Sequence, residues 1–194
     1  MPRSKSYNPD HVLEKAMCIF WENGYEATTV RLLEKEMGIN QFSIYSSFND
    51  KKNLFIESLK LYKRYIEKNV FNDLLREDAD ISDIELFLNE FSEKIRDGKF
   101  SNGCLMVNTV AEIGQKDERI HNEVKRYFDF VKEMFKEILV RSKKKGDISL
   151  DADIEKCSGY LVGIMQGLSV ATKVMSQKQL FDFINMSITS IHRF

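Results

Sequence analysis

Proline is nearly absent from this chain of 194 residues. Its two prolines are Pro2 and Pro9, so nothing after Pro9 obliges a helix to stop. Alternating apolar and polar stretches, which are typical of strands, are also hard to find. With 43% hydrophobic and 11% aromatic residues, the chain can build a substantial core. These features predict a nearly all-helical protein and argue against disorder over most of its length.

Cysteines and long apolar runs are scarce too. Cys18, Cys104 and Cys157 are odd in number and scattered, which excludes a disulfide scaffold and indicates a reducing compartment. We see no secretory leader before them. The longest uncharged run, between Lys156 and Lys173, has 16 residues, short of the roughly 20 that a membrane helix requires. We therefore expect a cytoplasmic protein that does not enter a membrane.

Signatures of enzymes are missing as well. His11, His121 and His192 are isolated, no glycine-rich phosphate loop appears, and neither histidines nor cysteines pair at a helical metal-ligand spacing. A carboxylate pair could be drawn from the 30 acidic residues, but nothing singles one out. We expect no catalytic residue, metal or cofactor. A cofactor-independent enzyme is the most remote alternative, and turnover screening tests it.

An excess of positive charge is also lacking. The net charge is −1, which by itself disfavours a nucleic-acid partner. Residues 1–70 are slightly basic, and the remainder is slightly acidic. The lysines at 143–145, before Gly146, are best interpreted as a solvated helix end. Any binding to nucleic acid must come from a local patch, and it should weaken with salt.

Residues 28–54 have the pattern of two short helices joined by a turn and followed by a third. Thr28 is a suitable cap for the first helix, whose inner side holds Leu33 and Met37. Gly38 can take the left-handed conformation that ends this helix, and Asn40 can cap the next one. The pattern predicts a tight helix-turn-helix.

The outer face of the second helix should be polar but almost uncharged, because Ile44 and Phe48 fall four apart on its inner side. Such a face suits DNA bases, since glutamine can bond to adenine, hydroxyls can meet bases or phosphates, and phenylalanine can touch a thymine methyl. The candidate DNA-contacting residues are Thr28, Arg31, Asn40, Gln41, Phe42, Ser43, Tyr45, Ser46 and Lys51. Spacing alone leaves an ordinary helical hairpin inside a core equally open.

Several landmarks at fixed spacing decide between these alternatives. They are Phe20, Gly24, Tyr25, Thr28-Thr29-Val30, Gly38-Ile39, Ile44-Tyr45, Phe48, Lys51 and Leu54. With them, the stretch from Asn8 to about Leu59 resembles the DNA-binding domain of the TetR family of transcriptional regulators. The resemblance implies that Thr28, Gln41, Phe42, Tyr45 and Lys51 fall where members touch DNA, Tyr45 and Lys51 on its backbone. Glu34 and Phe42 stand where many members carry smaller residues, so the operator sequence does not transfer.

The expected organisation is a helix-turn-helix domain over residues 1–50 and a helical effector-binding and dimerisation domain over 51–194. Asn8 and Pro9 should begin a first helix that ends near Gly24, and a helix after Asp50 should run toward Leu75. Further helices are expected at 82–96, 103–113, 117–145, 152–174 and 177–192, with breaks at Gly98, Gly114 and Gly146.

Glycine recurs every four residues in the helix expected at 152–174, which makes a smooth strip where another helix can approach closely. The strip could instead serve packing within one chain. By the family resemblance, the last two helices form a four-helix bundle with a second copy. The residues assigned to this homodimer interface are Gly159, Gly163, Gly167, Phe181, Ile184 and Ile188. Such a dimer would read two half-sites, about 34–36 Å apart or a multiple, on a pseudo-palindromic double-stranded operator.

Apolar residues of the middle helices could line a cavity for a small-molecule effector, although such residues are more often plain core. The candidates are Phe87, Phe91, Cys104, Asn108, Tyr127 and Met134. Ser101 or Asn102 can cap a helix that has Cys104 in its first turn, where the helix dipole favours a thiolate.

The stretch Gly103-Cys104-Leu105, with Asn108 one turn later, resembles one TetR subgroup. That subgroup includes electrophile-responsive repressors with a sensing cysteine at this place, and Lys173 resembles their partner lysine. The alternative is that Cys104 is a small core residue. The resemblance as a whole implies a repressor that a small molecule or electrophile releases from its operator. A helical ligand-binding or scaffolding protein without DNA contact is the alternative.

Overall fold

The computed structural model describes residues 7–96 and 102–194. Within these ranges the chain forms helices and no strand, which confirms the predicted all-α fold. The helices are α1 (Pro9–Asn23), α2 (Val30–Met37), α3 (Gln41–Phe48), α4 (Lys51–Asn69), α5 (Ile81–Arg96), α6 (Leu105–Glu112), α7 (Glu118–Lys145), α8 (Ile154–Val174) and α9 (Gln177–Ile191).

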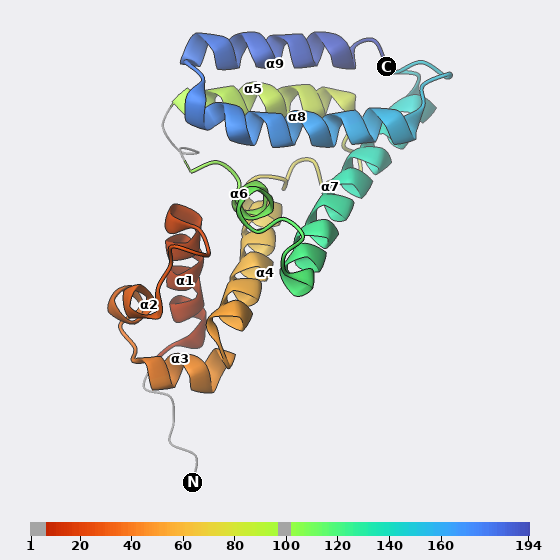
Figure 1. Cartoon of the computed structure of the whole chain (residues 1–194). Coiled ribbons are helices and arrows are strands. Elements are labelled where there is room, and N and C mark those ends of the chain that lie inside the picture. Colours follow the sequence, from red (N-terminus) through yellow and green to blue (C-terminus); the bar gives the residue numbers. More distant parts are fainter. Residues whose placement is uncertain (1–6, 97–101) are drawn as a thin grey trace.

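The helices are arranged along the length of the molecule (Figure 1). α1, α2 and α3 form one end, which we call the head (residues 7–50), and α8 and α9 lie at the other end with α5. α4 packs against α1 on one side and α7 on the other, and α7 packs along α8. α4 therefore belongs to the packing of both halves and connects them mechanically.

The helices of the head begin and end where polar side chains satisfy free backbone groups. The Asn8 side chain accepts the Asp10 N–H at 2.9 Å, and α1 ends at Gly24, which has a φ of 77°. Gly38 takes the left-handed conformation after α2, with φ 73° and ψ 24°. The Asp50 side chain accepts the Asn53 N–H at 2.7 Å and begins α4.

Predicted boundaries differ from the structure by two residues or more at the end of α4 and at the starts of α6 and α8. α6 begins at Leu105 rather than at Gly103. α4 ends at Asn69 rather than near Leu75, because the apolar pattern beyond it comes from Phe71 and Leu74, which are buried from an irregular segment. α8 begins at Ile154, after a cap by Asp153. Gly114 and Gly146 end their helices with positive φ values, whereas Gly98 lies outside the described residues.

Aromatic side chains connect the core of the head with that of the rest of the molecule, which we call the body (residues 51–194). Phe20 of α1 meets Phe55 of α4 edge to face, with ring centroids 4.8 Å apart, and Trp21 meets Tyr62 at 5.1 Å. Tyr62 in turn lies 6.4 Å from Tyr127 of α7. One core thus continues from head to body through α4. Among the described residues, no helix combines the length and apolar character needed to cross a membrane.

Candidate nucleic-acid interface and internal cavity

The outward face of α3 lies at the end of the molecule remote from α8 and α9 (Figure 1). The Asn40 side chain accepts the Ser43 N–H at 2.9 Å and begins α3, as predicted. Ile44 is fully buried and anchors the helix, whereas Gln41 is exposed and Phe42 is 81% exposed. Because such an exposed ring has almost no packing within the head, it is available to a partner surface.

Hydroxyl groups continue this face of α3. Tyr45 and Ser43 are half-buried, and Ser46 is exposed with its hydroxyl donating to the Ser43 carbonyl at 3.0 Å. The Tyr7 hydroxyl also donates to the Ser43 carbonyl, at 3.3 Å, and forms a hydrogen bond with Ser47. The chain before α1 is thereby attached to α3. The outward face offers amide, hydroxyl and apolar groups without a charge, the surface that base edges require.

Glu34 has a local role that explains its departure from the family pattern. Its carboxylate accepts the Gln41 N–H at 2.5 Å, which satisfies a free amide at the first turn of α3. A phosphate approaching this helix end would meet the same negative charge. Charge for phosphates must therefore come from side chains, and Arg31 and Lys35 are both exposed on α2.

The prediction that Thr28 caps α2 is wrong. The cap is Thr29, whose hydroxyl accepts the Leu32 N–H at 3.1 Å. Thr28 is fully buried, and its hydroxyl donates to the Gly24 carbonyl at 2.5 Å. Its side chain is therefore used to close the α1–α2 loop, and it does not reach the surface where DNA would lie.

Lys51 is engaged within the head. Its ammonium group donates to the carbonyls of Tyr25 and Thr28, at 2.8 and 2.9 Å, and lies 4.2 Å from the centre of the Tyr25 ring. An ammonium group has three N–H donors, so one is left for a phosphate. Lys51 therefore secures the α1–α2 loop as well as being a candidate for DNA contact.

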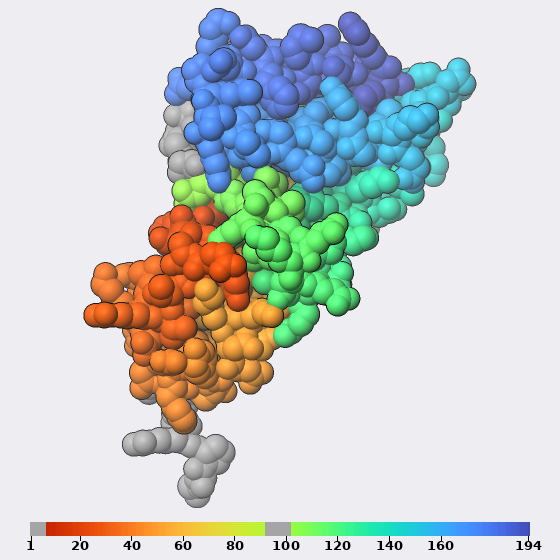
Figure 2. All heavy atoms as spheres, viewed as in Figure 1, coloured from red at the N-terminus to blue at the C-terminus, as the bar shows by residue number. Residues whose placement is uncertain are grey.

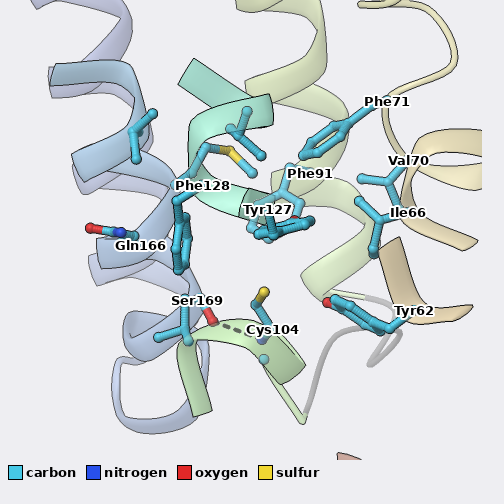
Figure 3. A pocket seen from close by; sticks show the side chains of 15 residues that line it. Tyr62, Ile66, Val70, Phe71, Phe91, Cys104, Tyr127, Phe128, Gln166 and Ser169 are labelled. Atoms are coloured by element: carbon cyan, nitrogen blue, oxygen red, sulfur yellow. Dashed lines mark hydrogen bonds between the residues drawn. The ribbon is translucent and has the colours of Figure 1, made fainter. Parts of the chain in front are cut away.

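A cavity lies outside the head, between α4, α5, α6, α7 and α8 (Figure 3). None of the described side chains that line it carries a charge. Its volume is about 50 Å³, room for only a few water-sized molecules. The lining residues are Tyr62, Ile66, Val70, Phe71, Phe91, Gly103, Cys104, Val107, Tyr127, Phe128, Val131, Val162, Met165, Gln166 and Ser169.

Three of the six effector candidates line this cavity, namely Phe91, Cys104 and Tyr127. The other three do not. Phe87 and Met134 are buried elsewhere in the core, and the Phe87 ring stacks on Phe91 and lies tilted against Phe71. Asn108 lies outside, where its side chain accepts from Lys173 Nζ at 2.6 Å and donates to the Asn102 carbonyl at 2.9 Å. Apolar periodicity, which suggested Phe87 and Met134, does not distinguish a cavity wall from solid core, and the structure places both away from this cavity. Asn108, which the subgroup resemblance suggested, lies away from it as well.

Cys104 precedes α6, although the sequence predicted it within the first turn of that helix. It is itself the N-cap of α6, with φ −97° and ψ 126°, so the proposed cap by Asn102 is wrong; Ser101 lies outside the described residues. The Cys104 N–H donates to Ser169 Oγ at 2.7 Å. The sulfur atom points into the cavity near Tyr62 and Tyr127 (Figure 3). Burial, followed by the neighbouring Cys104, raises the pKa of both tyrosines well above the ordinary range, so their hydroxyls stay protonated.

α8 and α9 form one continuous surface at the far end of the molecule (Figure 2). Gly159 and Gly163 are exposed with open space around them, whereas Gly167 approaches the Phe183 ring of the same chain. The strip of glycines is therefore partly internal.

Of the three predicted interface residues on α9, Phe181 is 55% exposed and Ile188 is half-buried. Ile184 is 1% exposed, so its assignment to the outer surface is corrected: it packs inside its own chain. The exposed apolar residues of this face are Tyr160, Val170, Val174, Met175, Phe181 and Met186.

Comparison with known proteins agrees with this architecture. The family model described as "Bacterial regulatory proteins, tetR family" matches residues 12–57, and that described as "Tetracyclin repressor-like, C-terminal domain" matches residues 60–186. The second match alone covers more than half of the chain. This protein belongs to the TetR family.

Two relatives match it over most of their lengths. The transcriptional repressor ComR of Escherichia coli is 26% identical over 88% of this chain and 82% of its own. The uncharacterised regulator YezE of Bacillus subtilis is 26% identical over 97% of this chain and 98% of its own. Among solved structures, a cysteine-substituted variant of the TetR family regulator CifR, in complex with 26 base pairs of operator DNA, superposes with a TM-score of 0.85. It is 23% identical and covers 97% of this chain and 98% of that chain.

The TetR family protein described here is thus a DNA-binding transcriptional regulator, and the helix-turn-helix interpretation of residues 28–54 is confirmed. Sequence reasoning missed several members of the cavity wall, among them Tyr62, Gln166 and Ser169. No local pattern marks Ser169 as the acceptor for the Cys104 N–H. These residues are brought together by packing between helices that are distant in the chain.

Proposed function

We propose that this TetR family regulator is a homodimeric repressor that holds a pseudo-palindromic operator and releases it when a small, uncharged molecule occupies the cavity. The single observation that carries DNA recognition is the exposed, uncharged face of α3, with Phe42 at 81% exposure beside Gln41. In this proposal Gln41, Phe42, Ser43 and Ser46 meet base edges. Arg31, Tyr45 and Lys51 meet phosphates, and Asn40 stays a helix cap.

The proposed division of labour follows the chain. Residues 1–50 form the DNA-binding domain, to which Lys51 at the start of α4 adds one phosphate contact, and residues 51–194 form the domain that binds the effector and the second copy. Because its partner is genomic DNA, we assign the protein to the cytoplasm. We assign it no catalytic activity, metal or cofactor.

The chemistry of the cavity favours a neutral effector. A charged ligand would leave water for a space without a countercharge, which is expensive in free energy. The cavity is also much smaller than sites that enclose a drug-sized ligand, which occupy roughly 300–1,000 Å³, so a larger effector has to displace the wall. The half-buried Cys104 thiol offers a covalent route for a small electrophile.

A selection of bound sequences from random duplex DNA tests the DNA-binding part. We expect enrichment of two inverted half-sites whose centres are one helical turn or a multiple apart, with binding that weakens as salt increases. No enrichment at low salt would instead favour the alternative, a ligand-binding or scaffolding protein without DNA contact. Repeating the selection with N-ethylmaleimide present tests release by an uncharged electrophile.

A further inference from the structure

α6 lies beside α4 and packs against α1 of the head as well as against α7 and α8 (Figure 1), and Cys104 and Val107 at its start line the cavity. It has eight residues, so it forms a rod about 12 Å long. Its first residue follows Cys104 in the cavity wall, and its last residue is Glu112. Both ends of this rod are attached to the head by hydrogen bonds.

At the far end, the Glu112 carboxylate holds the loop between α1 and α2. One oxygen accepts the Tyr25 N–H at 2.9 Å, and the other accepts the Glu26 N–H at 2.7 Å. The two contacts join residues 87 and 86 positions apart in the chain. Hydrogen bonds from backbone N–H groups to a carboxylate are stronger than those to a neutral acceptor. Glu112 therefore holds two consecutive residues of the loop in one geometry.

The loop is shaped to receive this carboxylate. Gly24 has a φ of 77°, and a Cβ atom built there would lie 2.8 Å from Glu112 Oε2. The positive φ favours glycine at this position, and a Cβ atom there would push the end of the Glu112 side chain away from the loop. The carbonyls of the same loop, those of Tyr25 and Thr28, are held by Lys51. Glu112 and Lys51 thus hold opposite sides of one segment, and Lys51 is a candidate for DNA contact.

At the near end, the connection passes directly from the cavity wall to α1. The Gly103 carbonyl accepts the Trp21 indole N–H at 3.0 Å. On its other side, a Cβ atom at Gly103 would lie 2.7 Å from the Ser169 carbonyl, and the next residue, Cys104, donates its N–H to the Ser169 hydroxyl. Gly103 and Cys104 are therefore confined between α1 and α8. The cavity holds only about 50 Å³, so a group larger than a few water molecules cannot fit beside the Cys104 sulfur unless the wall moves.

We propose that Glu112 is the positioning residue that couples occupancy of the cavity to the DNA-binding head. When the cavity is filled, Gly103 and Cys104 move, α6 shifts as a rod, and the Glu112 carboxylate leaves the N–H groups of Tyr25 and Glu26. The loop then loses its fixed geometry. As a result, α2, α3 and Lys51 are no longer held in the positions that fit DNA. The inference rests on the effector response proposed above, and it adds the residue through which that response passes.

The test uses the full chain with Cys18→Ser and Cys157→Ser, so that N-ethylmaleimide alkylates Cys104 alone. Operator affinity is measured before and after alkylation in this parent and in Glu112→Gln. The amide keeps the size of the side chain, but one of its terminal atoms becomes a donor facing an N–H donor. Gly24→Ala disturbs the same contact from the loop side. Glu26→Gln is the matched control, since it removes a neighbouring charge and leaves the Glu26 backbone N–H in place.

We expect alkylation to weaken operator binding about tenfold in the parent and in Glu26→Gln, and less than about twofold in Glu112→Gln and Gly24→Ala. If Glu112→Gln keeps the parent's ratio of affinities, the inference is wrong. A purely structural role for Glu112 would lower both affinities and leave that ratio unchanged.

Deuterium uptake across residues 24–28 separates this inference from the effector proposal. Alkylation should raise uptake in the parent to the level that Glu112→Gln shows without alkylation. If alkylation does not change the parent's operator affinity, the proposed effector response is wrong, yet a rise in uptake still supports the link from the cavity to the loop. Unchanged uptake in the parent overturns the link.

Discussion

The protein presents two exposed helical faces that differ in polarity. On α3 the outward groups are an amide, hydroxyls and one isolated ring, Phe42. On α8 and α9 large apolar side chains are exposed among polar ones, including Val174, Phe181 and Met186. An apolar surface is best covered by another apolar surface, whereas scattered polar groups match base edges. The difference supports our proposal that the first face binds DNA and the second binds another copy of the chain.

The largest expected effect comes from making the apolar face charged. Val174→Glu together with Phe181→Glu should abolish the dimer, because four carboxylates would be buried in its interface. Operator affinity should then fall roughly 100-fold or more, since two linked heads bind far better than one. Sedimentation velocity and a mobility-shift assay measure the two effects. Leu86→Glu, at an exposed apolar residue of α5, is the control. A dimer that survives would mean that this face is not the interface.

A smaller effect is expected on α3. Gln41→Ala should lower operator affinity roughly 10- to 100-fold and relax the preference at one base position per half-site, because it removes hydrogen bonds to a base edge. Competition binding with single-base operator variants measures both quantities. Gln115→Ala, at an exposed glutamine outside the head, should have no effect. Equal losses on all sequences would show that Gln41 does not read a base.

The smallest effect is expected at Lys51. Lys51→Ala should weaken binding several-fold on every duplex and reduce the slope of log affinity against log salt by about 1, because one phosphate contact is lost. The salt titration distinguishes this variant from Gln41→Ala, which should leave the slope unchanged. Lys68→Ala removes an exposed charge at the other end of α4 and serves as the control. An unchanged slope in Lys51→Ala would confine the lysine to its role in the α1–α2 loop.

Local patterns were sufficient for much of the head. Gly38 and Asn40 punctuate the turn as predicted, since left-handed glycine and asparagine caps act through their immediate neighbours. The choice between Thr28 and Thr29 failed, because either hydroxyl can cap a helix. The end of α1 places the Gly24 carbonyl where it can accept a hydrogen bond from the Thr28 hydroxyl. This tertiary contact buries Thr28 and leaves Thr29 to cap α2.

Patterns were weaker in the body, where the cavity and the outer face depend on packing between distant helices. Phe87 and Phe91 share one stripe of α5, yet only Phe91 borders the cavity. Phe181 and Ile184 likewise lie three residues apart on α9, but Phe181 is exposed and Ile184 is buried. Periodicity predicts that a residue faces inward, and it carries no information on whether the space there is filled.

The amino-acid sequence by itself determined the helices, the helix-turn-helix and the polar character of its outer face, because these depend on residues within a few turns of one another. Only the tertiary structure decided that Glu112 reaches the loop after α1 and that Cys104 lies beside Tyr62 and Tyr127. Those contacts span tens of residues along the chain, and they exist because packing of apolar helix faces brings the segments together and orients the polar groups at their edges.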